Sequence, residues 1–279
     1  MPLALITGAN TGLGFETARG LLGLGFEVVI TSRDIERGNN AVARLESEYP
    51  NAQISAFALD LSIQSSVRAF ASSFTQAHKK WDVLVLNAGA KVLSKYQETD
   101  SGIEYHFGVN AVGHFELVAN LLPHRALISR VVSVSSIVAR FAPRELGPAG
   151  SALSYSAGAS YSASKLSNYL FAMELENRFG SDSFSSLAAH PGFARAEPYG
   201  PNSTRFFESF MAQSAAQGAL PIVEAATDSS LPGGSYRVPK ILELWGKPAE
   251  GIVPKMTSRK SLEKNWEILE TLSGKNLAL

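Results

Sequence analysis

The chain has 279 residues, of which 45% are apolar and 18% charged, enough for one large α/β domain or two small ones. Its formal net charge of zero gives no electrostatic reason to expect nucleic acid or an acidic membrane surface as a partner. It has no cysteine, which excludes disulfide bonds, a thiolate nucleophile and cysteine-based metal sites, and we expect no metal.

The first apolar run, Leu3 to Ile6, is short and has no basic leader before it. The sequence has no run of about 18 apolar residues, so we expect no membrane span. These features predict a soluble protein, and we expect a cytoplasmic location.

Short apolar runs alternate with helical patterns through the first 190 residues. We predict strands at Leu3–Thr7, Glu27–Ser32, Gln53–Asp60, Asp82–Asn87, Arg130–Ser135 and Phe184–His190. Apolar residues at helical spacing predict helices over Gly12–Leu24, Ser62–Lys80 and Lys255–Leu272. The alternation predicts a single α/β domain over residues 1–279, with a doubly wound (Rossmann) mostly parallel sheet and helices on both faces.

Two segments lack this regular pattern. Residues 137–160 are rich in Ala, Gly, Ser and Pro and predict a mobile substrate lid. Several Pro and Gly residues over 193–240 predict a flap above the site. Four apolar residues of that flap fit a greasy substrate site and a core cluster equally well; they are Phe206, Phe207, Phe210 and Met211.

A glycine-rich turn, Thr-Gly-Ala-Asn-Thr-Gly-Leu-Gly at residues 7–14, joins the first strand to the first helix. Gly8 permits a tight turn, Gly12 lets backbone N–H groups approach a pyrophosphate, and Gly14 allows close packing of helix on strand. A phosphate would then lie at the helix N-terminus. The alternative is an ordinary glycine-rich turn, because such patterns are weak evidence alone.

The end of the second strand carries Ser32 and Arg33. An acidic residue here binds the ribose hydroxyls of NAD, whereas an arginine can bind the 2′-phosphate of NADP. We therefore predict a preference for NADPH over NADH, the alternative being a solvated Arg33 with Asp34 as its partner. Asp60 is placed to bind the adenine, or to cap the following helix together with Ser62.

Tyr161 and Lys165 are four residues apart, so a helix places both side chains on one face. A neighbouring ammonium group favours the phenolate, which predicts a lowered pKa for Tyr161. Such pairs are also common on exposed helix faces. Tyr155 is a competing phenol, but it lacks a lysine four residues later, because position 159 is alanine.

Other polar residues follow the central strands. Ser135 and Ser136 end one strand and Asn87-Ala-Gly89 ends another, so both lie where a cofactor cleft is expected. Asn110 lies in an apolar helical segment and needs hydrogen-bond partners there. Its alternative role is to satisfy a kinked backbone.

In this order, these motifs resemble the short-chain dehydrogenase/reductase family over about residues 1–195. The likeness rests on residues 7–14, Asp60, 87–89, Asn110, Ser135–Ser136, Tyr161/Lys165 and His190-Pro-Gly192. The glycine-rich turn, Ser-Arg-Asp at 32–34 and the 25-residue interval from Ser136 to Tyr161 resemble the retinol-dehydrogenase-like branch.

The resemblance implies a mechanism. Tyr161 is the proton donor, Lys165 lowers its pKa and holds the nicotinamide ribose, Ser136 polarises the carbonyl, and Asn110 holds a water. Ala196 stands where the family usually has a threonine that binds the nicotinamide carboxamide. The residues expected to bind the cofactor are Thr7, Gly8, Asn10, Thr11, Gly12, Leu13, Gly14, Ser32, Arg33, Asp60, Leu61, Asn87, Ala88, Gly89, Tyr161, Lys165, Pro191 and Gly192.

The sequence thus predicts an NADP(H)-dependent oxidoreductase that interconverts a carbonyl and an alcohol on a hydrophobic small molecule. One alternative is a catalytically silent NADP(H)-binding redox sensor, although such proteins typically lose the Tyr/Lys pair that this chain has. A second alternative is a retinoid enzyme at a membrane surface. Both a monomer and a homodimer stay open, because helices near residues 103–122 and 161–179 fit a dimer face or a simple cover for the sheet.

Overall fold

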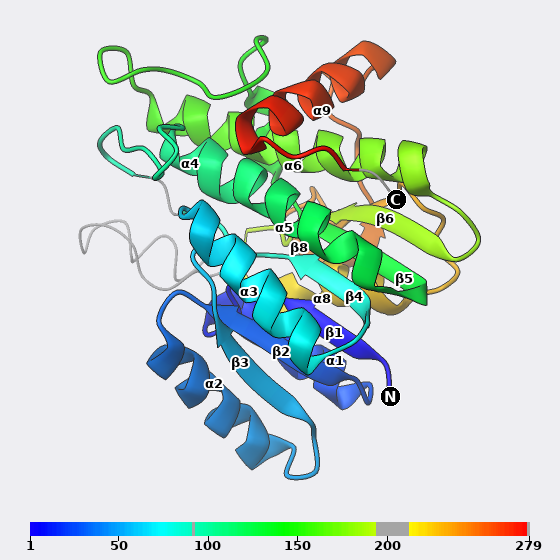
Figure 1. Cartoon of the computed structure of the whole chain (residues 1–279). Coiled ribbons are helices and arrows are strands. Elements are labelled where there is room, and N and C mark those ends of the chain that lie inside the picture. The colour runs from blue at the N-terminus through cyan, green and yellow to red at the C-terminus, as the bar shows by residue number, and fades with distance from the viewer. Residues whose placement is uncertain (91–92, 194–211, 278–279) are drawn as a thin grey trace.

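The computed structural model describes residues 1–90, 93–193 and 212–277. Its centre is an eight-stranded sheet of order β3-β2-β1-β4-β5-β6-β7-β8, in which β8 alone runs antiparallel to its neighbour (Figure 1). The strands are β1 (Leu3–Ile6), β2 (Glu27–Ser32), β3 (Ile54–Ala58), β4 (Trp81–Leu86), β5 (Arg125–Val134), β6 (Phe184–Ala189), β7 (Tyr236–Ile241) and β8 (Trp245–Glu250). The predicted mostly parallel, doubly wound sheet is confirmed.

Helices cover both faces of this sheet (Figure 1). They are α1 (Gly12–Gly23), α2 (Ile35–Glu48), α3 (Gln64–Ala77), α4 (Tyr105–Phe107), α5 (Gly113–Leu121), α6 (Ala157–Phe179), α8 (Ala215–Thr227) and α9 (Arg259–Ser273), with the π-helix η1 (Gly108–Val112) and the 3₁₀ helices η2 (Leu122–His124) and η3 (Ile137–Phe141). Among the described residues, no helix combines the length and apolarity that a membrane crossing requires.

The alternation of side chains along the strands divides the core into two layers. In β1, Leu3 and Leu5 pack with residues of α3, α5 and α6, whereas Ala4 and Ile6 pack with residues of α1, α2 and α8. Both faces of the central strands are therefore apolar, which is why these strands are continuous apolar runs in the sequence. The chain order reverses between β1 and β4, and the carboxyl ends of these strands border the crevice where ligands bind in such folds.

The predicted C-terminal helix is confirmed as α9, and it covers the outer side of α5 and α6. Its Trp266 is 1% exposed and packs against Phe115 and Phe171, with ring centroids 5.3 and 5.8 Å away. Asn265 donates a hydrogen bond to the backbone oxygen of Ser167 on α6. Helix α9 therefore covers α5 and α6, the two helices that we predicted to form either a dimer face or a cover for the sheet.

The predicted flap over 193–240 is wrong for much of its length. Residues 215–227 form α8 and residues 236–241 form β7, both parts of the core architecture. Pro221 lies inside α8, where packing of Ile222 and Ala225 in the core outweighs its poor helix propensity. Ala196 and the four apolar flap residues Phe206, Phe207, Phe210 and Met211 lie outside the described residues.

Candidate active site

The glycine-rich turn between β1 and α1 has the backbone shape that an anion site requires. Gly8 and Gly12 have φ angles of +63° and +59°, which favour glycine. A Cβ atom on Gly14 would lie 2.5 Å from Asn87 Nδ2 and 2.6 Å from the Gly8 carbonyl oxygen. A Cβ on Gly12 would meet no described atom within 4 Å, so this turn is open to a ligand. These features fit a dinucleotide pyrophosphate at the N-terminus of α1.

Thr7 ties this turn to the segment that follows β4. Its hydroxyl oxygen accepts hydrogen bonds from the backbone N–H groups of Asn87 and Ala88, each at 2.9 Å. The Asn87 side-chain amide donates in return to the Thr7 carbonyl oxygen at 2.8 Å. The structure therefore brings Thr7–Gly14 together with Asn87–Gly89, as the order of the motifs predicted.

At the end of β2, Arg33 is exposed and Ser32 is buried. The Arg33 guanidinium donates a hydrogen bond to the Tyr105 hydroxyl at 3.2 Å. Asp34 is instead the N-cap of α2, where it accepts hydrogen bonds from the N–H groups of Glu36 and Arg37. The alternative in which Asp34 pairs with Arg33 therefore has less support, because this carboxylate caps the helix.

Asp60 closes a turn rather than capping a helix. Its carboxylate accepts hydrogen bonds from the Ser62 N–H at 2.9 Å and from the Ser62 hydroxyl at 2.6 Å. The next helix, α3, begins only at Gln64 with Ile63 as its N-cap, so the predicted capping role is wrong. Leu61 is buried under Gly113, on which a Cβ would lie 2.5 Å from the Leu61 carbonyl oxygen. Adenine binding by Asp60 stays a prediction.

Tyr161 and Lys165 lie on α6, with the Lys165 ammonium nitrogen 5.8 Å from the centre of the Tyr161 ring. Lys165 is 4% exposed and donates a hydrogen bond to the Val134 carbonyl oxygen at 3.0 Å. Burial lowers the pKa of Lys165 to about 8. Burial also raises the pKa of Tyr161, so the predicted lowering of the phenol pKa is wrong in this structure. Burial disfavours the charged phenolate, so Tyr161 is a neutral phenol at neutral pH.

Asn110 lies in η1, the single π-helical turn before α5. Its side-chain oxygen accepts a hydrogen bond from the Ala90 N–H at 2.6 Å, and its amide donates to the Ser164 hydroxyl at 2.9 Å. A Cβ on Gly89 would lie 3.4 Å from the Asn110 side-chain oxygen and 3.6 Å from the Lys165 nitrogen. Gly89, Asn110 and Lys165 thus converge at one point. The wider turn, which we predicted only as helix, is the kind found at functional sites.

The two serines after β5 have different surroundings. The Ser135 hydroxyl is buried and donates to the Lys165 carbonyl oxygen at 2.7 Å. Ser136 is partly exposed and is the N-cap of η3, where its oxygen accepts from the Val138 N–H at 3.5 Å. Ser136 is therefore the more exposed of the two serines, and its contact with a substrate stays a prediction.

The Pro191–Gly192 turn is held by a residue that the sequence did not point to. Gly192 has a φ angle of +75°, and a Cβ there would lie 2.5 Å from the Leu244 carbonyl oxygen. The Gln213 amide donates to the Pro191 carbonyl oxygen at 2.7 Å. Nothing in the sequence pattern marks Gln213, because it precedes α8 and belongs to no motif.

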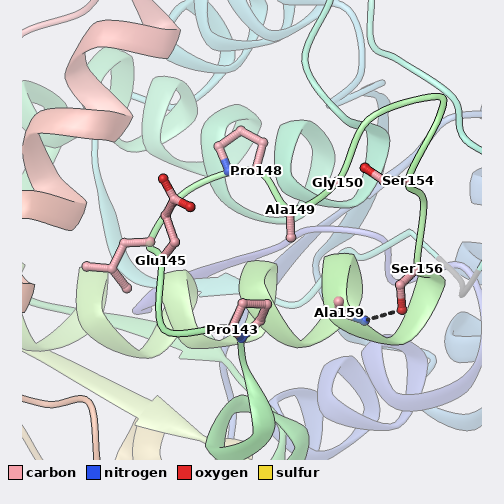
Figure 2. Close-up of a pocket in the computed structure, with 9 residues that line it drawn as sticks. Pro143, Glu145, Pro148, Ala149, Gly150, Ser154, Ser156 and Ala159 are labelled. Carbon is pink, nitrogen blue, oxygen red and sulfur yellow. Dashed lines mark hydrogen bonds between the residues drawn. The ribbon is translucent and has the colours of Figure 1, made fainter.

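The segment between Ser136 and Tyr161 encloses a hollow of about 240 Å³, separate from the Tyr161/Lys165 pair. Figure 2 shows this hollow between the segment and the first turn of α6, where the Ser156 side chain accepts from the Ala159 N–H. The segment is anchored at both ends: Arg140 pairs with Glu243, and the Ser160 hydroxyl donates to the Ala149 carbonyl oxygen. Lid motion of this segment stays a prediction.

The family model for short chain dehydrogenases matches residues 2–199. The chain belongs to this family. Human retinol dehydrogenase 12 is 35% identical over 98% of this chain and 86% of its own length, and mouse retinol dehydrogenase 14 is 33% identical over 97% and 85%. A solved structure of an uncharacterised protein from Mycobacterium Paratuberculosis is 31% identical, with a TM-score of 0.83 over 100% of this chain and 96% of that one.

Salutaridine reductase from Papaver somniferum shares the fold, with a TM-score of 0.66 and 21% identity over 85% of this chain and 99% of that one. As a short-chain dehydrogenase of the retinol-dehydrogenase-like branch, the chain is an oxidoreductase that acts on CH–OH groups and interconverts alcohol and carbonyl. Enzymes of this family bind NAD(P), which carries the hydride.

We predict that Gly14→Ala weakens NADPH binding at least tenfold. The added Cβ would collide with Asn87 Nδ2 and with the Gly8 carbonyl oxygen, so the turn must open. A fluorescence titration with NADPH measures the affinity. Gly158→Ala on α6 is the control, because a Cβ there meets no described atom within 4 Å. Wild-type affinity in Gly14→Ala would contradict the placement of the pyrophosphate.

The pKa of Lys165 predicts a pH-dependent stability. Burial lowers this pKa from 10.5 to about 8, so between these pH values the unfolded chain binds more protons than the folded one. Stability from this group therefore rises with pH across that window. Lys165→Met removes the cost of the buried ammonium group, so its stability relative to wild type should be highest near pH 7.5 and decline by pH 9.5. Urea unfolding at both pH values measures this, and an unchanged difference would contradict the prediction.

Proposed function

We propose that the chain is an NADP(H)-dependent oxidoreductase that reduces a hydrophobic aldehyde or ketone and catalyses the reverse oxidation. The observation that carries this proposal is the pairing of Tyr161 with the buried Lys165, whose ammonium nitrogen lies 5.8 Å from the centre of the ring. A raised phenol pKa keeps a transferable proton on Tyr161 at neutral pH. A carbonyl that accepts a hydride needs such a proton on its oxygen.

In this proposal, the Tyr161 hydroxyl transfers its proton to the substrate oxygen while Ser136 donates a hydrogen bond to the same oxygen. A nicotinamide cofactor held by the turn at residues 7–14 would supply the hydride-transfer chemistry at the substrate carbon. Lys165, charged below about pH 8, stabilises the phenolate that remains on Tyr161. Asn110 and Lys165 flank Gly89, where a water that returns the proton from solvent would be held.

The alternative of a silent redox sensor has less support. A sensor needs the dinucleotide site alone. Here Lys165 is 4% exposed, and its ammonium group has one hydrogen-bond acceptor among the described residues, so its burial costs free energy of desolvation. NADPH consumption with a panel of hydrophobic ketones and aldehydes separates the two functions, because a sensor would bind NADPH and consume none.

The preference for NADP(H) rests on the end of β2. Arg33 offers an exposed guanidinium there, and the preceding position is a buried serine rather than a carboxylate. A carboxylate would repel a 2′-phosphate, whereas a guanidinium can bind it with two hydrogen bonds.

A hydrophobic substrate is supported by two observations. The relatives carry the name of retinol, an apolar alcohol, and the chain aligns with the human enzyme over 98% of its length. Phe141, which ends η3 after Ser136, and Phe193, which follows Gly192, are 76% and 41% exposed. These rings provide apolar surface close in sequence to two motifs of the site.

A second copy of the chain is not proposed on the face of α5 and α6, because α9 covers it. A cytoplasmic location remains the prediction made from the sequence.

We predict that Tyr161→Phe removes nearly all turnover, while NADPH affinity stays within a few-fold of wild type. The ring is kept and only the transferable proton is lost. Tyr155→Phe is the matched control and should keep most of the turnover, because that phenol has no lysine partner. If Tyr161→Phe kept more than a tenth of wild-type turnover with chemistry rate-limiting, Tyr161 would not be the acid.

Arg33→Ala should weaken NADPH binding by roughly 10- to 100-fold and leave NADH binding nearly unchanged. A charge-assisted hydrogen bond contributes about 1.5–3 kcal/mol, and 1.4 kcal/mol is tenfold in affinity. The ratio of kcat/KM for the two cofactors, at fixed ionic strength, measures the effect. Arg37→Ala on α2 removes the same charge one turn away and should leave the ratio unchanged. An unchanged ratio in Arg33→Ala would refute the cofactor assignment.

A further inference from the structure

His114 on α5 lies between the cofactor turn and the candidate catalytic residues. It is 2% exposed, and each of its ring nitrogens has a hydrogen-bond partner. Nε2 is 2.9 Å from the Thr7 hydroxyl oxygen, and Nδ1 is 2.9 Å from the Asn110 carbonyl oxygen. No role was predicted for this residue from the sequence, and the proposed mechanism does not use it.

The chemistry of the partners determines the direction of both hydrogen bonds. A carbonyl oxygen only accepts, so Nδ1 carries the proton and donates to Asn110. The Thr7 oxygen already accepts from the N–H groups of Asn87 and Ala88, which occupy its two lone pairs. Its own proton therefore points outward, and Nε2 at 2.9 Å is a nearer acceptor than the Val85 carbonyl oxygen at 3.3 Å. His114 is thus a neutral imidazole with its proton on Nδ1.

We propose that His114 is a positioning residue that couples the cofactor turn at Thr7 to the catalytic geometry at Asn110. The inference rests on the proposed function, because it takes Asn110 and Thr7 to serve catalysis and cofactor binding. One ring connects the two, so a shift of Thr7 on cofactor binding would be transmitted to the π-helical turn η1.

The π-helical turn explains why Asn110 needs such a contact. Within η1, the Gly113 N–H donates to the Gly108 carbonyl oxygen, five residues back instead of four. This wider turn directs the Asn110 amide to Ser164 on α6 and its oxygen to the Ala90 N–H. A donor on His114 holds the Asn110 backbone at the point where these two contacts are set.

The surroundings of His114 are consistent with a neutral ring. Burial, and secondarily the charge of Lys165, lowers the pKa of His114 to about 4. A protonated ring would place a second N–H against a hydroxyl oxygen whose lone pairs are already used.

Two substitutions separate the two contacts. His114→Asn places its amide where Nδ1 lies, so it keeps the contact with Asn110 and loses Thr7. His114→Gln places its amide oxygen where Nε2 lies, so it still accepts from the Thr7 hydroxyl and loses Asn110. We expect His114→Gln to lower turnover at saturating NADPH about tenfold with little change in NADPH Kd. We expect His114→Asn to raise the NADPH Kd about tenfold and to keep turnover at saturating NADPH within a few-fold.

His114→Leu should show both defects, and Val118→Ala is the control for a loosened core. Val118 is fully buried on the same helix and contacts neither partner, so its variant should lower Tm and leave Kd and turnover unchanged below the unfolding transition. Identical effects of His114→Asn and His114→Gln would overturn the coupling. So would a His114→Leu enzyme that behaves like Val118→Ala.

A measurement on the wild-type chain is independent of turnover and of whether the variants fold. ¹⁵N NMR of the His114 ring should report Nδ1 protonated and Nε2 unprotonated from pH 8 down to pH 5.5. A proton on Nε2, or titration with a pKa near 6.5, would overturn the inference. If wild type binds NADPH but reduces no carbonyl of the panel, the proposed function fails, whereas the NMR result and the NADPH titrations of the variants still decide the His114 contacts.

Discussion

The candidate site depends on keeping one ammonium group inside the protein at the carboxyl end of β5. Among the described residues, the Lys165 ammonium group has one hydrogen-bond acceptor, the Val134 carbonyl oxygen. An isolated buried charge is costly, so the backbone around it must be held firmly. The Ser135 hydroxyl donates a hydrogen bond to the Lys165 carbonyl oxygen. This hydrogen bond fixes α6 against the end of β5. The same contact engages the Ser135 hydroxyl, so our proposal gives the contact with the substrate to Ser136.

Small residues make room for this arrangement. Gly89 separates Asn110 from Lys165, and a Cβ there would touch both side chains. Gly14 similarly lets the Asn87 amide pass between β1 and α1 to reach the Thr7 carbonyl oxygen. At Gly14 the approach of the Asn87 amide leaves no space for a Cβ, whereas at Gly89 a Cβ would lie in ordinary van der Waals contact with its neighbours. The cofactor turn and Asn110 belong to one hydrogen-bonded unit, in which the His114 ring lies between Thr7 and the Asn110 carbonyl oxygen.

Much of this unit could be predicted from the sequence because its signals are local. The glycine-rich turn, the i to i+4 spacing of Tyr161 and Lys165, and the polar ends of buried strands each depend on a few neighbouring residues. The contact of Gln213 with Pro191 and that of His114 with Thr7 could not be found in this way, because these partners lie 22 and 107 residues away in the chain. The predicted flap was wrong around Pro221 for the opposite reason. The local signal of this proline favoured a loop, but tertiary packing placed it inside α8.

The pKa of Tyr161 is another property that the local sequence pattern predicted in the wrong direction. Spacing alone predicted that an ammonium group one turn away would lower the pKa of the phenol. That attraction requires a charged Lys165, but the burial that shields the pair lowers the pKa of Lys165 to about 8 and raises that of Tyr161. Desolvation acts on both partners in the direction that favours two neutral groups. A neutral Tyr161 suits the reduction of a carbonyl, in which the phenol gives up its proton. Oxidation of an alcohol needs the phenolate, and burial makes this form of Tyr161 scarce at neutral pH.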